Sequence, residues 1–151
     1  MRSPTGEEAG TGKVATYVEL ARGGDTSLTG YKLAPGSYLH KERLVQRCAL
    51  TWFRTGSHWL RVEVGRWAGL PRAQRTCQLC GGGAVEDEAH ALFHCAGYTA
   101  IRVAVPYAAL FAGGAHATVA AFLAQDAGLV AAFVEKCRAL REDRLGGLAT
   151  T

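Results

Sequence analysis

Four metal-ligating side chains within 19 residues constrain this chain more than any other feature. Cys77, Cys80, His90 and Cys95 follow the spacing C-x2-C-x9-H-x4-C. Thiolates and an imidazole at such spacing are the ligands that tetrahedral Zn²⁺ prefers. The first pair is expected on a tight turn, where the glycines at 81–83 let the backbone reverse over the metal. The sequence therefore predicts a small zinc-binding knuckle, with Zn²⁺ as the cofactor.

The identity of the fourth ligand is less certain than that of the first three. We expect a short helix over residues 86–95, begun by three acidic side chains that suit the positive end of its dipole. His90 and His94 would share a face of that helix, which would give a Cys2His2 site. Cys95 can reach the metal only if the helix ends near His94, and Gly97 favours such an ending. We favour Cys95 and keep His94 as the alternative; a redox-active thiol pair is a further reading of the first two cysteines.

The two remaining cysteines, Cys48 and Cys137, each fall on an apolar helical face, where a free thiol behaves as a small core hydrophobe. No disulfide is needed, which points to a reducing compartment. Residues 1–10 contain no apolar run, so no signal peptide is expected. The apolar run at 103–112 is far too short to span a membrane. We expect an intracellular protein, nuclear or cytoplasmic, with no membrane partner.

Length and pattern predict a single small domain, mainly α with a zinc-binding knuckle or β-hairpin. The chain has 151 residues, of which 48% are hydrophobic and 20% charged. Residues 1–37 are expected to be a flexible N-terminal segment with one possible short helix over 14–22. Residues 103–145 are expected to form a C-terminal helical extension.

Local patterns predict the following elements. Ser37 caps a helix over 38–54 that stops at Gly56, and the alternation of residues 59–65 indicates a short strand. A helix perturbed by a proline covers 98–107. Thr118 caps a short helix that ends at residue 124, and Asp126 caps a longer one over 127–143. The basic residues of that last helix, Lys136, Arg138, Arg141 and Arg144, alternate with acidic ones and indicate an ordinary exposed face.

The positive charge is concentrated before the metal cluster. Residues 41–75 carry eight basic and two acidic side chains, a balance of +6, whereas the whole chain has a net charge of +4. Such a segment with interleaved tryptophans can contact a nucleic-acid backbone and stack on unpaired bases. Equally, it can be a solvated arginine face with the tryptophans packed in the core, where we expect Trp52. The candidate nucleic-acid-binding residues are Arg43, Arg47, Arg54, Arg61, Arg66, Arg72, Arg75, Trp59 and Trp67.

Residues 38–102 resemble a known family, the reverse-transcriptase zinc-binding domain that follows the polymerase in non-LTR (LINE-like) retrotransposon proteins. The matching motifs are Tyr38-Leu39, Leu50-Thr51 to Arg54-Thr55-Gly56, Leu60 to Glu63 and Gly65-Arg66, Pro71-Arg72, Cys77 to Cys80, Glu86-Asp87-Glu88 to His90, and Phe93 to Cys95. The resemblance implies the ligand set Cys77, Cys80, His90 and Cys95. It also implies an auxiliary role in handling RNA or DNA beside a polymerase, and the polymerase part of a retroelement protein as a partner.

One departure from the family limits what the resemblance implies. The chain contains no paired-aspartate Tyr-x-Asp-Asp motif, so it is either a fragment of such a protein or a stand-alone relic. No polymerase or nuclease motif indicates an enzyme, and a zinc ion with four protein ligands has no open position for water. Two function classes remain: a nucleic-acid-binding module and a structural or protein-interaction module. Burial of both Trp59 and Trp67 would weaken the first.

Overall fold

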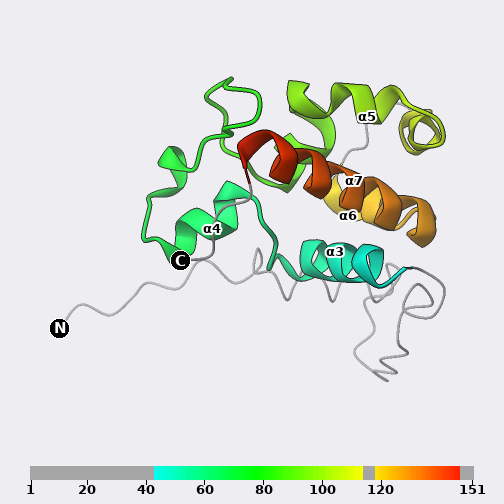
Figure 1. Ribbon diagram of the computed structural model, residues 1–151, viewed down its shortest axis with the longest axis horizontal. Helices are drawn as coiled ribbons and strands as arrows, with labels where there is room; N and C mark the ends of the chain where they lie inside the picture. The colour runs from blue at the N-terminus through cyan, green and yellow to red at the C-terminus, as the bar shows by residue number, and fades with distance from the viewer. Residues whose placement is uncertain (1–42, 114–117, 147–151) are drawn as a thin grey trace.

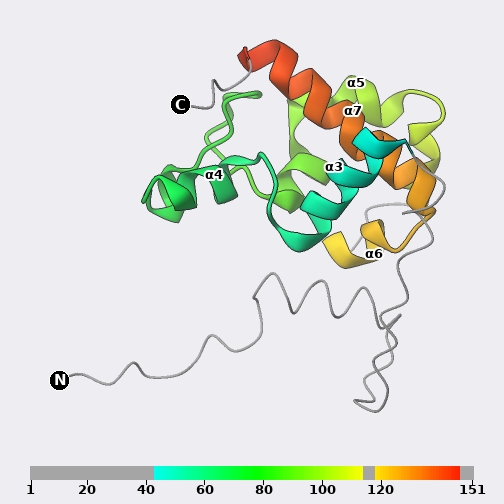
Figure 2. The ribbon, with the colours of Figure 1, turned by 60° about the horizontal axis from the view of Figure 1, so that its bottom comes forward.

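Two long helices form the centre of the fold. In the computed structural model, α3 (Leu44–Thr55) lies beside α7 (Ala127–Leu145), as Figures 1 and 2 both show. The structure describes residues 43–113 and 118–146, and these form a small, mainly helical domain. Between the two helices the chain forms α4 (Arg61–Trp67), η1 (Arg72–Gln74), the π-helical turn η2 (His90–His94), η3 (Ala96–Tyr98), α5 (Thr99–Val103), η4 (Tyr107–Phe111) and α6 (Val119–Leu123).

The core is built from the facing sides of these helices. Leu50 and Phe53 of α3 are buried against α7, which contributes Phe133 and Val134. Phe122 of α6 joins Phe133 through an edge-on ring contact, with 5.6 Å between the ring centroids. Aromatic side chains bury large areas and dominate such cores. The C-terminal helices therefore complete the same core that α3 begins.

The two C-terminal helices begin as the sequence predicts. The Thr118 side chain accepts a hydrogen bond from the backbone N–H of Ala121, and the Asp126 carboxylate accepts one from Leu129. Each cap satisfies a backbone donor that the first turn of a helix leaves free. Capping depends only on residues close in sequence, so the sequence predicted both helix starts correctly.

Across the described residues, no helix is long and apolar enough to cross a membrane.

The first helix differs from the prediction at its start and in its buried face. It ends at Gly56, which has a left-handed φ of 65°, as expected, but it begins at Leu44 rather than near residue 38. Ser37, the expected cap, lies outside the described residues, as do the rest of segment 1–37 and its possible helix. The prediction that Trp52 belongs to the core is wrong, because its side chain is 47% exposed, and Cys48 is only half-buried.

The predicted strand at residues 59–65 is wrong, because this segment forms α4. Two backbone N–H groups at the start of α4 bond to one residue of the knuckle: Arg61 donates to the Glu86 carboxylate and Val62 to the Glu86 carbonyl, at 2.9 and 3.0 Å. The guanidinium of Arg75 donates to the Val62 carbonyl from the other side. These tertiary contacts stabilise a seven-residue helix whose short apolar alternation favoured a strand.

Two smaller predictions also need correction. The helix expected over 98–107 is divided into α5, which ends at Val103, and η4, which follows Pro106, because the residue before a proline is disfavoured in the helical conformation. The knuckle is not a β-hairpin. Within the described ranges no strand is formed, and Thr76 and Val85 make an isolated antiparallel bridge.

Candidate metal centre

The knuckle that carries the first two cysteines is a short antiparallel loop. Its arms are joined at the Thr76–Val85 bridge and by a hydrogen bond from the Cys77 N–H to the Ala84 carbonyl, at 2.8 Å. Between them Gly81 and Gly83 adopt left-handed φ values of 64° and 74°. Side chains other than glycine are strained in this conformation, so the glycine run permits the turn, as predicted.

The four predicted ligands meet at one point. The nearest ligand atoms of Cys77, Cys80, His90 and Cys95 all lie within 4.8 Å of one another. The Sγ atoms of Cys77 and Cys95 are 3.8 Å apart, and Cys80 Sγ is 3.4 Å from His90 Nε2. A tetrahedral zinc ion with Zn–S of about 2.3 Å and Zn–N of about 2.0 Å would separate its ligands by roughly 3.8 and 3.5 Å. The donor set and its spacing therefore fit a tetrahedral metal ion.

A π-helical turn brings Cys95 to the metal side. The Cys95 N–H donates to the His90 carbonyl five residues earlier, at 2.7 Å, and this widens the turn η2. In a regular helix, residues five apart point in directions about 140° apart, and the wider π turn reduces this difference. His94 is exposed and lies outside the cluster. The structure therefore brings Cys95, and not His94, into the cluster that could hold a metal ion.

Burial makes two of the three thiols of this cluster, Cys77 and Cys95, hard to ionise without a cation. It raises the pKa of Cys77 to about 12, although the backbone N–H groups of Cys80 and Leu79 oppose this by hydrogen bonding to the sulfur. Burial likewise raises the pKa of Cys95, whereas the Gly82 N–H lowers that of Cys80. A metal ion would replace the thiol protons and supply the missing positive charge.

The histidine of the cluster is held in the form that binds metals. Burial lowers the pKa of His90, which favours the neutral imidazole. Its backbone N–H donates to the Asp87 carboxylate at 2.9 Å. Arg102 closes the other end of the turn by donating to the carbonyls of Ala91, Leu92 and Cys95. Both ends of η2 are therefore fixed by charged side chains.

The structure contains a buried ion pair beside the cluster that the sequence did not predict. The Arg141 guanidinium of α7 donates to both oxygens of Glu86, at 2.8 and 3.0 Å. The two side chains are 3% and 0% exposed, so the prediction that Arg141 belongs to an exposed face is wrong. The Glu86 carboxylate also lies 3.9 Å from Cys77 Sγ. No local pattern could have found a contact between residues 55 positions apart.

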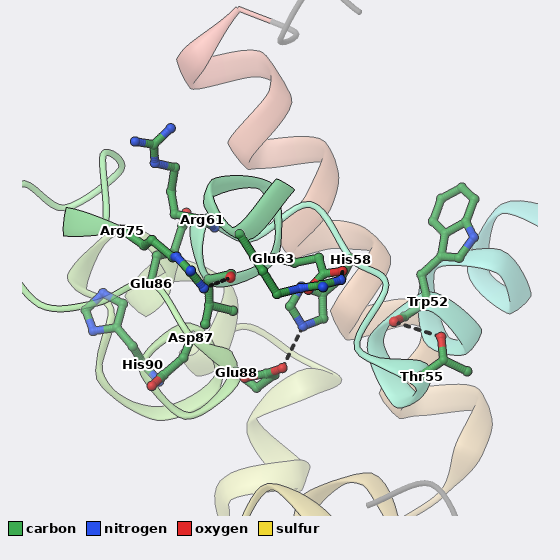
Figure 3. A network of polar contacts seen from close by, with 12 residues as sticks. Trp52, Thr55, His58, Arg61, Glu63, Arg75, Glu86, Asp87, Glu88 and His90 are labelled. Atoms are coloured by element: carbon green, nitrogen blue, oxygen red, sulfur yellow. Dashed lines mark hydrogen bonds and ion pairs between the residues drawn. The ribbon is translucent and has the colours of Figure 1, made fainter. Parts of the chain in front are cut away.

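A second contact that the sequence did not predict links His58, which precedes α4, to the acidic residues at 86–88. His58 Nε2 lies 2.7 Å from a Glu88 oxygen, and Figure 3 shows this link within the group of polar side chains around α4. His58 is 5% exposed and packs beside the rings of Phe53 and Trp59. Burial opposes ionisation of Glu88, but the hydrogen bond and charge of His58 outweigh it and lower the pKa of the carboxyl.

The seven candidate arginines do not form one free surface. Arg54 donates to the Leu123 carbonyl at 2.9 Å, and Arg75 donates to the carbonyls of Leu70 and Val62 at 2.8 Å. These two guanidinium groups therefore have structural partners in the fold. Arg54, a candidate nucleic-acid-binding residue, is therefore partly engaged within the fold. Arg47 and Arg61 are half-buried, and Arg43 is exposed at the start of α3.

Arg66 and Arg72 keep most of their surface in solvent while each pairs with a carboxylate. Arg66 bonds to Glu63 at 2.8 Å and remains 53% exposed. Arg72 bonds to Asp87 at 2.8 Å and remains 60% exposed. The Arg72–Asp87 pair is largely exposed, and such pairs contribute little to stability, whereas Arg66 pairs with a Glu63 side chain that is only 3% exposed. Both guanidinium groups keep enough surface in solvent to contact an anion.

The two candidate tryptophans have different environments. Trp59 is half-buried against the core, with its ring 6.0 Å from that of Phe53. Trp67 ends α4 and is 72% exposed. A stacking model therefore retains one large exposed ring, next to Arg66 and five residues from Arg72.

Comparisons with protein-family models, with curated proteins and with solved structures found no match to this chain. The resemblance to the retrotransposon zinc-binding domain therefore rests on the motif residues alone. Function has to be argued from the site itself.

Proposed function

We propose that this chain is a zinc-binding auxiliary module of a retrotransposon-derived reverse transcriptase, which binds RNA or DNA. The observation that carries the proposal is the exposure of Trp67, Arg66 and Arg72, which lie within seven residues of one another in the sequence before the cysteine knuckle. An exposed indole ring can stack on a base, and exposed guanidinium groups nearby in the sequence can contact phosphates. The motif resemblance supports the same role.

The metal has a structural part in this proposal. With Cys77, Cys80, His90 and Cys95 as ligands, a zinc ion would have four protein donors and no position for a reacting water. Two of the donors, Cys77 and Cys95, are almost completely buried. The ion would hold the loop after η1 against η2, and so would fix the surface that carries Trp67.

The test is a binding titration of the zinc-loaded chain with labelled single-stranded RNA, single-stranded DNA and duplex of equal length, repeated at several salt concentrations. We expect Trp67→Ala to weaken single-strand binding by about 1–3 kcal/mol, the usual value of one stacked base. Trp52→Ala is the matched control, because Trp52 is also exposed but lies on α3.

The charge contribution is tested by the double variant Arg66→Ala, Arg72→Ala. If each guanidinium neutralises one phosphate, the slope of log K against log salt should fall by roughly 1.5–2. The control replaces Lys136 and Arg144, two exposed basic residues of α7. No binding at low salt, or equal slopes for the two double variants, would refute the nucleic-acid role.

A specific observation favours the second candidate, a zinc-stabilised protein-interaction module. Leu44, Val45 and Trp52 form an exposed apolar stripe on α3, with 65%, 54% and 47% of their surfaces in solvent. Figure 3 shows the Trp52 ring pointing away from the polar group around α4. Its partner would be the polymerase part that precedes this region in the resembling proteins. Co-purification with that part, lost in Trp52→Glu and kept in Trp67→Ala, would favour this candidate.

A further inference from the structure

We propose that Glu86 and Arg141 are positioning residues for the metal centre, through which α7 controls how tightly the knuckle holds its ion. The inference rests on the proposed zinc site and adds a second part of the chain to it. The four ligands lie within residues 77–95, whereas Arg141 is near the end of α7. Figures 1 and 2 show the C-terminal end of α7 approaching the knuckle and α4.

The position of Glu86 is fixed from several directions. Its backbone N–H donates to the Arg75 carbonyl at 2.9 Å, and its carbonyl accepts from Val62 at 3.0 Å. One carboxylate oxygen accepts from the Arg61 N–H at 2.9 Å and from Arg141 Nη2 at 3.0 Å. The other accepts from Arg141 Nε at 2.8 Å. The carboxylate therefore joins the knuckle, α4 and α7 at one buried point.

The same carboxylate touches the metal cluster. Its oxygen lies 3.9 Å from the Sγ atom of Cys77, which is itself 3% exposed. Zn²⁺ with three thiolates and one neutral imidazole carries one net negative charge. The Glu86 carboxylate adds a second negative charge, and the Arg141 guanidinium offsets it. Without Arg141, two negative charges would lie side by side in a largely buried place, with Arg102 at the Cys95 carbonyl as a remaining guanidinium, which is unfavourable.

The arrangement predicts how single and double replacements differ. Arg141→Met keeps an unbranched apolar stem but removes the charged guanidinium, so it should weaken zinc binding by about 10–100-fold, the usual effect of losing a residue that supports a metal ligand. Glu86→Gln combined with Arg141→Met removes both charges and should recover most of the affinity. Arg141→Lys should recover part of it, because one ammonium group replaces the charge but not the pair of hydrogen bonds.

The experiment measures the zinc dissociation constant of the full chain by competition with a chelator at fixed pH. Arg138→Met is the matched control, because Arg138 pairs with Glu135 and Glu142 within the same helix. Its zinc affinity should be unchanged. The sulfur-to-metal charge-transfer bands of the Co²⁺-loaded protein should shift in Arg141→Met and not in the control, since the sulfur of Cys77 would lose its fixed neighbour. A variant that merely lost stability would not show such a shift.

The outcomes separate this inference from the proposed function. If the parent chain takes up no zinc, both fail together. If it binds zinc and Arg141→Met binds it as tightly, or if the double variant is no better than Arg141→Met, the inference alone fails. Should Arg141→Met not fold, Arg141→Lys against Arg138→Lys decides: equal zinc affinities overturn the proposal, and a severalfold loss confined to Arg141→Lys supports it.

Discussion

Replacing two adjacent residues, Cys95 and His94, tests the metal centre most directly. Cys95 is completely buried and belongs to the cluster, whereas His94 is exposed on the same turn. Structural zinc contributes about 10–16 kcal/mol apparent at neutral pH. Divided evenly among four ligands, this is roughly 2.5–4 kcal/mol each, or a loss of about 10²–10³-fold in affinity. We therefore expect Cys95→Ala to lose zinc on that scale and His94→Ala to bind it as the parent does.

The assay combines elemental analysis of purified protein with chelator competition, and circular dichroism reports whether the helices persist. We expect Cys95→Ala to keep much of its helical signal, because α3 packs directly against α7 and neither helix carries one of the four candidate ligands. The η2 turn should lose order at its Cys95 end, while Ala91 and Leu92 of the same turn remain packed in the core. Zinc bound to Cys95→Ala with parental affinity, or lost from His94→Ala, would refute the ligand assignment.

Two further predictions concern packing and the arginines. In Gly97→Ala the new Cβ would lie 2.5 Å from Cγ of Leu79. We therefore expect the free energy of unfolding of the zinc-loaded protein, measured in urea, to fall by about 1–3 kcal/mol, and the addition of Leu79→Ala to restore part of it. Equal losses in the single and the double variant would contradict this. Arg54→Met removes the donor to a carbonyl at the end of α6 and should destabilise by about 1–3 kcal/mol while the salt slope of nucleic-acid binding stays unchanged. Parental stability with a reduced slope would instead make Arg54 a phosphate contact.

The cluster of candidate metal ligands could be predicted because the residues that form it are close in sequence. Cys77 and Cys80 need only a tight turn, and Gly81 and Gly83 provide its left-handed residues. Choosing between His94 and Cys95 needed one more fact, the π turn, which depends on a single shifted backbone hydrogen bond. No residue type predicts such a shifted hydrogen bond, so the spacing alone could not decide between His94 and Cys95 as the fourth ligand.

The buried face of α3 could not be predicted, although the helix itself could. Apolar side chains cover more than half of its circumference, and periodicity does not say which part of a broad apolar arc packs. The structure buries Ala49, Leu50 and Phe53 and leaves Leu44 and Trp52 exposed. The position of α7 decides this, and that position depends on the whole core.

Burial that depends on distant parts of the chain also explains why the sequence predicts an exposed position for Arg141. Glu86 was read as a favourable charge at a helix start, and Arg141 as part of an alternating exposed face, because charged residues are rarely buried. Burial becomes acceptable only when a partner supplies both charge and hydrogen bonds, and here the partner is 55 residues away. Such a pair is costly to break by removing one side and cheap to replace as a whole. Its Glu86 carboxylate lies 3.9 Å from the sulfur of Cys77, a candidate metal ligand, so zinc affinity is the quantity to measure.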